Sequence, residues 1–200
     1  MTKGKRTAAR ILDVAEERFA RDGYAATSLR DIAAAAGIQQ PGLYKYFTCK
    51  EELYRSVYER SMRPLLAVLD EGAAEGDIGS FLALTDRLID YLAAHPNIAR
   101  LLVRASLLPP EEADAVATEW LQLLVRHGEA LNARAGIAAA PDLLALQILS
   151  VFHLVFGYFA AAPVTTAMTG RALDDPHMIS LHKTLVAGFV ASLQAPPTPR

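Results

Sequence analysis

The fold is decided by residues 27–47, which read TSLRDIAAAAGIQQPGLYKYF. The Thr-Ser pair that opens this stretch can cap a short helix over Leu29 to Ala36, because hydroxyl oxygens accept the free N–H groups of a first helical turn. Gly37 is expected to end this helix, since glycine adopts a left-handed turn without a Cβ clash. A second short helix is expected from Gln40 to Phe47. Two short helices joined by a glycine turn predict a helix-turn-helix.

The segments on either side of this motif also predict helices. Apolar residues recur with helical spacing from Thr7 to Asp22, and Gly23 is the expected stop. A longer helix is expected from Lys50, with a kink or a break at Pro64. The remainder predicts further helices and no strand, so the fold is expected to be all-α with about nine helices.

Three parts of the N-terminal segment carry a family resemblance. They are residues 27–38 (TSLRDIAAAAGI), residues 42–47 (GLYKYF) and residues 50–53 (KEEL), and the preceding FARDGY at 19–24 matches as well. Together they resemble the DNA-binding domain of the tetracycline repressor (TetR) family of bacterial transcriptional regulators over roughly residues 7 to 55. The resemblance implies a three-helix DNA-binding domain followed by a helical ligand-binding and dimerisation domain.

The resemblance also implies which residues meet DNA. Side chains in the recognition helix would reach bases or backbone phosphates, while those before it would touch phosphates or a groove edge. The residues implied are Thr27, Ser28, Arg30, Gln39, Gln40, Pro41, Gly42, Tyr44, Lys45, Tyr46 and Lys50. Here Gln39-Gln40-Pro41 stands where many members have Ser-x-Gly or Ser-x-Pro, and Gly42 offers no side chain to a base.

Charge is divided unequally along the chain. The net charge of −2 combines 12 basic and 8 acidic residues in residues 1–63 with 8 basic and 14 acidic residues in residues 64–200. A basic N-terminal third suits a polyanionic partner such as double-stranded DNA. The single cysteine, Cys49, excludes an internal disulfide, and the basic first residues lead into no apolar signal segment, so a cytoplasmic protein is expected. Cys49 itself is either an ordinary surface thiol or an oxidant sensor.

Residues 143–170 contain no Asp, Glu, Lys or Arg, and a run of this length can cross a bilayer. Gln147, Ser150, His153 and Pro163 interrupt the run, and neither flank is rich in Lys or Arg, as an anchored span usually is. A helix buried in protein satisfies the same pattern. We therefore expect a buried intersubunit helix and no membrane partner.

The C-terminal helices are expected to enclose a small-molecule effector, as the family resemblance implies. Their aromatic and aliphatic side chains suit an apolar or aromatic ligand. The candidate lining residues are Phe81, Leu88, Tyr91, Trp120, Phe152, His153 and Phe156. Plain core packing is the alternative for each of them, and His153 is open to three roles: core histidine, dimer contact or ligand donor.

The last two helices have the character of a subunit interface. Small residues allow close approach of two helices, and their neighbours are too apolar to face water, so two copies would form a four-helix bundle. The candidate interface residues are Leu154, Gly157, Tyr158, Leu185, Gly188 and Phe189.

The expected organisation is a helix-turn-helix domain over residues 1–52, an effector-binding and dimerisation domain over 53–195, and a flexible tail over 196–200. The five histidines form no i, i+4 pair, and no phosphate loop, dinucleotide fingerprint or nucleophile elbow occurs, so no metal, cofactor or enzyme activity is expected. The function expected is a dimeric transcriptional regulator that binds a palindromic operator and is released by a small molecule, with repression favoured over activation. The alternative is a helical dimeric module that binds a small molecule or a protein but not DNA.

Overall fold

The computed structural model describes residues 2–72, 78–108, 115–134 and 140–193, all of them in helices or short connections. The helices are α1 (Lys3–Ala26), α2 (Leu29–Ala35), α3 (Gln40–Leu43), α4 (Lys50–Gly72), α5 (Ile78–Ala94), α6 (Pro96–Ser106), α7 (Ala115–Arg134), α8 (Pro141–Ala160), α9 (Ala162–Thr169) and α10 (Pro176–Leu193). The described residues contain no strand, so the all-α prediction is confirmed. The predicted tail at 196–200 lies outside them.

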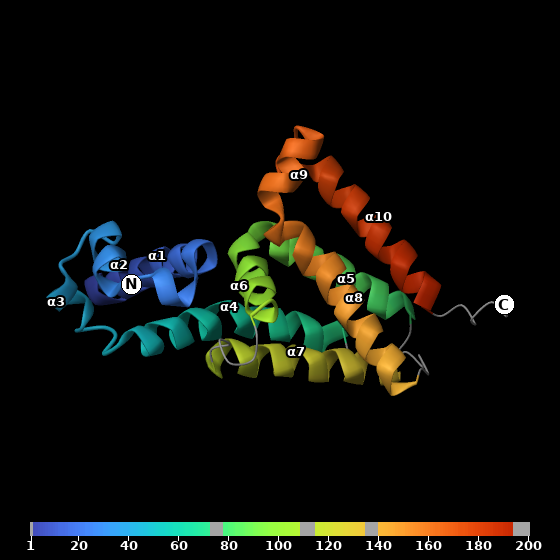
Figure 1. Ribbon diagram of the computed structural model, residues 1–200, viewed down its shortest axis with the longest axis horizontal. Helices are drawn as coiled ribbons and strands as arrows, with labels where there is room; N and C mark the ends of the chain where they lie inside the picture. The colour runs from blue at the N-terminus through green and yellow to red at the C-terminus, as the bar shows by residue number, and fades with distance from the viewer. Residues whose placement is uncertain (1, 73–77, 109–114, 135–139, 194–200) are drawn as a thin grey trace.

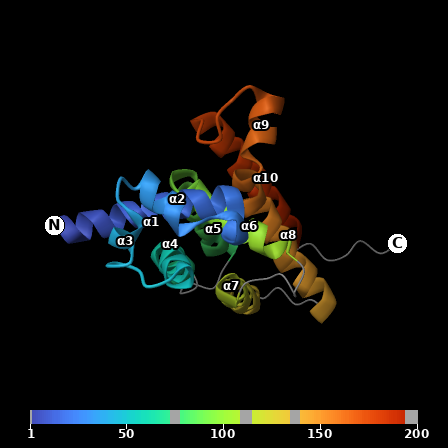
Figure 2. The same cartoon turned by 60° about the vertical axis from the view of Figure 1, so that its left-hand side comes forward.

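Helices α1 to α3 form a small unit at one end of the molecule, and α5 to α10 form the body at the other (Figure 1). Helix α4 runs from the first unit into the body, so the predicted boundary between residues 52 and 53 falls inside a continuous helix. Helix α9 stands out from the body in both views (Figures 1 and 2). None of the side chains of α9 is buried within the chain.

Helix α4 continues past Pro64, so of the two predicted outcomes, a kink or a break, the break does not occur. A proline inside a helix has no N–H for the carbonyl four residues earlier, here that of Arg60. Packing offsets this loss because α4 buries a face that includes Val57, Met62 and Leu65. The second helix of the motif is also shorter than predicted, since regular helix ends at Leu43 and a turn follows.

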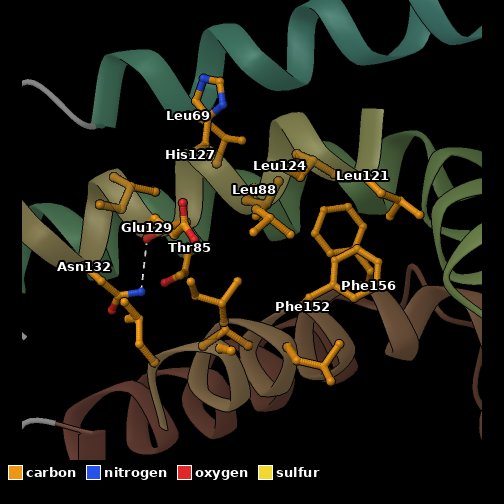
Figure 3. A pocket seen from close by; sticks show the side chains of 18 of the residues that line it. Leu69, Thr85, Leu88, Leu121, Leu124, His127, Glu129, Asn132, Phe152 and Phe156 are labelled. Atoms are coloured by element: carbon orange, nitrogen blue, oxygen red, sulfur yellow. Dashed lines mark hydrogen bonds between the residues drawn. The ribbon is translucent and has the colours of Figure 1, made fainter. Parts of the chain in front are cut away.

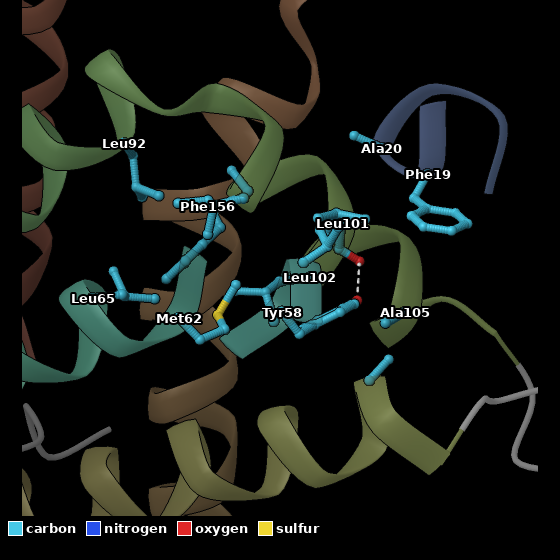
Figure 4. Close-up of a cluster of buried hydrophobic side chains, with 14 of the residues drawn as sticks. Phe19, Ala20, Tyr58, Met62, Leu65, Leu92, Leu101, Leu102, Ala105 and Phe156 are labelled. Atoms are coloured by element: carbon cyan, nitrogen blue, oxygen red, sulfur yellow. Dashed lines mark hydrogen bonds between the residues drawn. The ribbon is translucent and has the colours of Figure 1, made fainter. Parts of the chain in front are cut away.

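One continuous hydrophobic core joins the two ends of the molecule. Figure 4 shows Tyr58, Met62 and Leu65 of α4 facing Leu102 of α6 and Phe156 of α8. The Tyr58 hydroxyl donates to the backbone oxygen of Leu101 on α6, at 3.5 Å. The DNA-binding end and the body therefore share packed side chains along α4 and α6.

Candidate functional site

The helix-turn-helix is held by a small buried cluster and by its caps. The Ser28 hydroxyl accepts the Asp31 N–H at 3.1 Å and so caps α2. Ile32 and Ala33 of α2 and Leu43 of α3 are buried against one another's helices. Gly37 has φ +67°, the left-handed conformation that the sequence predicted for this turn.

The outer side of this motif presents polar side chains to solvent. Arg30, Gln39, Pro41, Tyr44 and Lys45 are exposed, whereas Gln40, Gly42 and Tyr46 are half-buried. Gln39 caps α3 through its backbone only, so its amide is not engaged in the cap. In contrast, the Gln40 amide donates to the Tyr44 hydroxyl at 3.3 Å. Gln39 is thus the freer of the two amides to read a base edge, and its role remains a prediction.

Two of the predicted phosphate ligands are occupied by contacts within the chain. Thr27 is buried, and its hydroxyl donates to the Gly23 oxygen at 2.7 Å, so its one proton is already used. The Lys50 ammonium donates to the Ala25 oxygen at 3.3 Å and lies 4.3 Å from the centre of the Tyr24 ring. Partial burial lowers the pKa of Lys50. Thr27 thus caps the end of α1, and Lys50 holds that end against the start of α4.

The start of α4 carries a reciprocal cap. The Glu52 carboxylate accepts both the N–H and the hydroxyl of Thr48 at 2.6 Å, and these hydrogen bonds lower the pKa of Glu52. The exposed Cys49 sulfur accepts the Glu52 N–H at 3.4 Å. Cys49 therefore serves helix capping, and no thiol partner is available in a chain with one cysteine.

The body contains a cavity of about 600 Å³ between α5, α7 and α8 (Figure 3). This volume lies within the usual range for small-molecule sites. Among the predicted ligand contacts, Phe81, Leu88, Phe152 and Phe156 line it. Leu69, near the end of α4, and Ser106, the last residue of α6, also reach its wall.

The other three predicted contacts do not line this cavity. The Tyr91 hydroxyl donates to the Ser61 oxygen at 3.1 Å, and burial raises the pKa of Tyr91. Trp120 is half-buried on α7, next to Leu121, which does line the cavity. His153 is exposed, and its Nδ1 lies 2.9 Å from the Leu149 oxygen of the preceding turn, so the core role considered for it is wrong.

Five polar residues of the cavity were missed by the sequence analysis. They are Thr85 on α5, Ser106 on α6, and His127, Glu129 and Asn132 on α7. Thr85 and Asn132 are buried, with 4% and 6% exposure. Both interrupt otherwise apolar helix faces, and that interruption was the available signal.

The outward faces of α8 and α10 are apolar and largely uncovered within one chain. Helix α8 is long and apolar enough to cross a membrane, yet only 22% of its most apolar window is buried. Leu185 and Gly188 are exposed, whereas Leu154, Gly157, Tyr158 and Phe189 are half-buried. Tyr158 is engaged inside the chain, because its hydroxyl donates to the Leu173 oxygen at 3.1 Å and its ring stacks on His182. Leu146 and Leu149 add exposed apolar surface that the sequence analysis did not assign.

Within the described parts of the chain, no three His, Cys, Asp or Glu residues are grouped to hold a metal ion. The residues that are placed for function are thus a polar face on the helix-turn-helix and a largely apolar cavity in the body. This combination is typical of a transcriptional regulator with a DNA-binding end and a separate cavity in its body.

Comparison with known proteins supports that class. Residues 11–57 match the family described as bacterial regulatory proteins of the tetR family. The HTH-type transcriptional repressor SCO4008 of Streptomyces coelicolor is 35% identical over 150 residues, which cover 71% of this chain and 74% of that protein. RutR, an HTH-type transcriptional regulator of Escherichia coli, is 29% identical over 196 residues, covering 87% of this chain and 86% of RutR.

A solved structure shows the same fold over nearly the whole chain. It is a TetR-family transcriptional regulator from Bordetella parapertussis, with a TM-score of 0.68, 21% identity and 95% of each chain covered. The chain belongs to the TetR family. It is therefore a DNA-binding transcriptional regulator and not an enzyme, and the alternative of a module without DNA binding is set aside.

Proposed function

We propose that this protein is a cytoplasmic repressor that binds a palindromic operator as a homodimer and is released when a small molecule fills the cavity. The observation that carries the proposal is the link between cavity and DNA-binding end within single helices. Helix α4 begins beside the recognition motif at Lys50 and reaches the cavity wall at Leu69. Helix α6 reaches the wall at Ser106 and contacts α1 two residues earlier.

The contact from α6 to α1 is made by Arg104. Its guanidinium donates to the backbone oxygens of Arg21 at 3.3 Å and Asp22 at 3.1 Å. These carbonyls lie at the end of the first stretch of α1, where the helix has no further N–H donors to offer. A displacement of α6 at the cavity is therefore transmitted directly to the end of α1.

A second contact holds α1 against α4. Arg60 pairs with Asp13 at 2.7 Å and with Glu16 at 2.9 Å, and the Ser61 hydroxyl donates to Glu16 at 2.9 Å. Because α1 is attached to both α4 and α6, a change in the angle between these two helices reorients the helix-turn-helix. The size of that response depends on how differently the ligand binds the two conformations.

Dimerisation would place two recognition helices on one face of DNA. The exposed apolar faces of α8 and α10 are expected to pair around a twofold axis as a four-helix bundle. Recognition helices about 34–36 Å apart fit successive major grooves and a palindromic site. An effector that changes this spacing lowers operator affinity.

The test is selection of bound sequences from a random DNA pool, followed by operator binding with and without cavity ligands. We expect enrichment of a palindrome and a steep fall in affinity with salt, because Lys and Arg contacts to phosphates release counterions. Failure to enrich any palindrome would refute the operator proposal. Transcription from the selected operator, measured with and without the protein, separates repression from activation.

A further inference from the structure

Polar side chains of α5 and α7 lie toward one end of a largely apolar cavity. In Figure 3, Thr85, Glu129 and Asn132 lie toward one end, whereas Leu121 and the two phenylalanines of α8 lie toward the other. Leu121 and Asn132 are eleven residues apart on α7, which corresponds to about 16 Å along a helix. The shape therefore suits an elongated molecule with an apolar body and one polar head.

The buried polar groups at this end are only partly satisfied by the chain. The Thr85 hydroxyl donates to the Leu82 oxygen at 2.8 Å, and the Asn132 amide donates to the Gly128 oxygen at 3.0 Å. Each side chain keeps an oxygen that can accept a hydrogen bond. A head group that donates hydrogen bonds matches these acceptors.

The charges at the cavity are not balanced. His127 lies against Asp70 at 3.1 Å and against the Leu123 oxygen at 2.9 Å, so both of its ring nitrogens are engaged. Glu129 forms no hydrogen bond or ion pair with any residue of the described ranges, and no Lys or Arg of those ranges lines the cavity. An anionic head would meet the Glu129 carboxylate without a compensating cation.

We propose that the cavity binds a lipophilic amine, an elongated apolar molecule with one protonated nitrogen that lies beside Glu129 and donates to Thr85 and Asn132. This inference rests on the cavity being the effector site and names the chemical class of the effector. The apolar tail lies along Leu88 and Leu121 toward Phe156, where its burial supplies most of the affinity. The interaction of the ammonium with Glu129 determines which head group is preferred.

Three ligands with the same chain length and different heads test the proposal: dodecylamine, 1-dodecanol and dodecanoate. Each is titrated below its micelle concentration into the full-length protein, and binding is measured by isothermal titration calorimetry at pH 7. We expect dodecylamine to bind about tenfold more tightly than dodecanoate, with dodecanol between them, because attraction and repulsion at an exposed carboxylate each change affinity by up to about fivefold. Dodecanoate binding as tightly as dodecylamine, or no binding of any of the three, would overturn the proposal.

A matched pair of variants locates the effect. Glu129→Gln keeps the shape of the side chain and removes its charge, so we expect dodecylamine to lose about fivefold in affinity and dodecanol to be unchanged. Glu119→Gln is the control, because Glu119 lies on the same helix but pairs with Arg55 at 3.2 Å and does not line the cavity. If Glu129→Gln and Glu119→Gln bind dodecylamine equally, the ammonium does not interact with the Glu129 carboxylate.

This experiment is independent of DNA binding. If the protein selects no palindrome but prefers dodecylamine through Glu129, the proposed function is refuted and the proposed ligand class stands. If it selects an operator but shows no head-group preference, the proposed function stands and the proposed ligand class is refuted.

Discussion

Gly23 lies beside the contact that Arg104 of α6 makes with the end of α1, and Gly23→Ala is predicted to weaken this contact. The backbone there has φ +84° and ψ 169°, a region that is essentially restricted to glycine. A Cβ at this position would lie 2.6 Å from Nε of Arg104, closer than real Cβ contacts. The substitution therefore strains the backbone and displaces the guanidinium together.

The two effects have separate magnitudes. A side chain forced into this backbone region costs about 2 kcal/mol. Displacing Arg104 from the carbonyls of Arg21 and Asp22 costs about 1 kcal/mol, a value reduced from that of buried charged hydrogen bonds because Arg104 is exposed. Gly23→Ala is thus expected to lower the free energy of unfolding by about 3 kcal/mol.

A double-mutant cycle separates the contributions. In an Arg104→Ala background the clash is absent, so Gly23→Ala is expected to cost only the backbone strain of about 2 kcal/mol, leaving a coupling energy of about 1 kcal/mol. Urea unfolding followed by circular dichroism gives each free energy, and operator binding gives the functional consequence. Gly4→Ala is the control on the same helix, because no atom lies within 4 Å of a Cβ there. A Gly23→Ala protein as stable as the control would refute the assignment of Gly23.

Three further predictions address the other parts of the molecule. Combining Tyr44→Phe with Lys45→Ala should weaken operator binding and reduce the slope of log affinity against log salt by about one, as for the loss of one phosphate contact; an unchanged slope excludes Lys45. Burial lowers the pKa of His182, so the unfolded chain binds a proton more readily and the free energy of unfolding falls as the pH drops below about 6.5, the ordinary value. In His182→Leu, the free energy of unfolding measured in urea should depend less on pH in that range. Leu185→Glu should produce monomers in analytical ultracentrifugation, whereas Leu107→Glu, another exposed leucine, should not.

The sequence predicted the local structure of the DNA-binding end well because short-range rules govern it. Gly37 was placed as a helix stop by glycine's access to positive φ, and it adopts that conformation after α2. Gly23, where a stop was also predicted, has positive φ too, but there the helix bends and continues to Ala26. Ser28 was a possible cap of α2 and is its cap. The helix does not break at Pro64 because a proline's local cost does not include the tertiary packing that keeps α4 helical.

The cavity was only partly predictable because it depends on which faces of distant helices meet. Phe81 and Phe152 carry the predicted aromatic character, but so do Tyr91, whose hydroxyl bonds to Ser61, and Trp120, and neither of these two lines the cavity. Periodicity identifies an apolar face and does not say which of its residues border empty space. A buried Thr or Asn on such a face is more specific, since burial of a polar group is costly unless something bonds to it.

Thr27 and Lys50, which the family resemblance places at DNA phosphates, also make contacts within the chain at the end of α1. In this structure Thr27 bonds to the oxygen of Gly23, where α1 bends, and Lys50 bonds to that of Ala25 beyond the bend, while Arg104 bonds to Arg21 and Asp22 before it. Two other helices therefore bond to the end of α1, α4 through Lys50 and α6 through Arg104, while Thr27 is the C-cap of α1 itself. Because a phosphate would compete for Lys50 and an occupied cavity would move α6, we expect DNA and effector to act on the same bend in α1. On this proposal the end of α1, rather than the recognition helix, is the place where binding at one site alters the other.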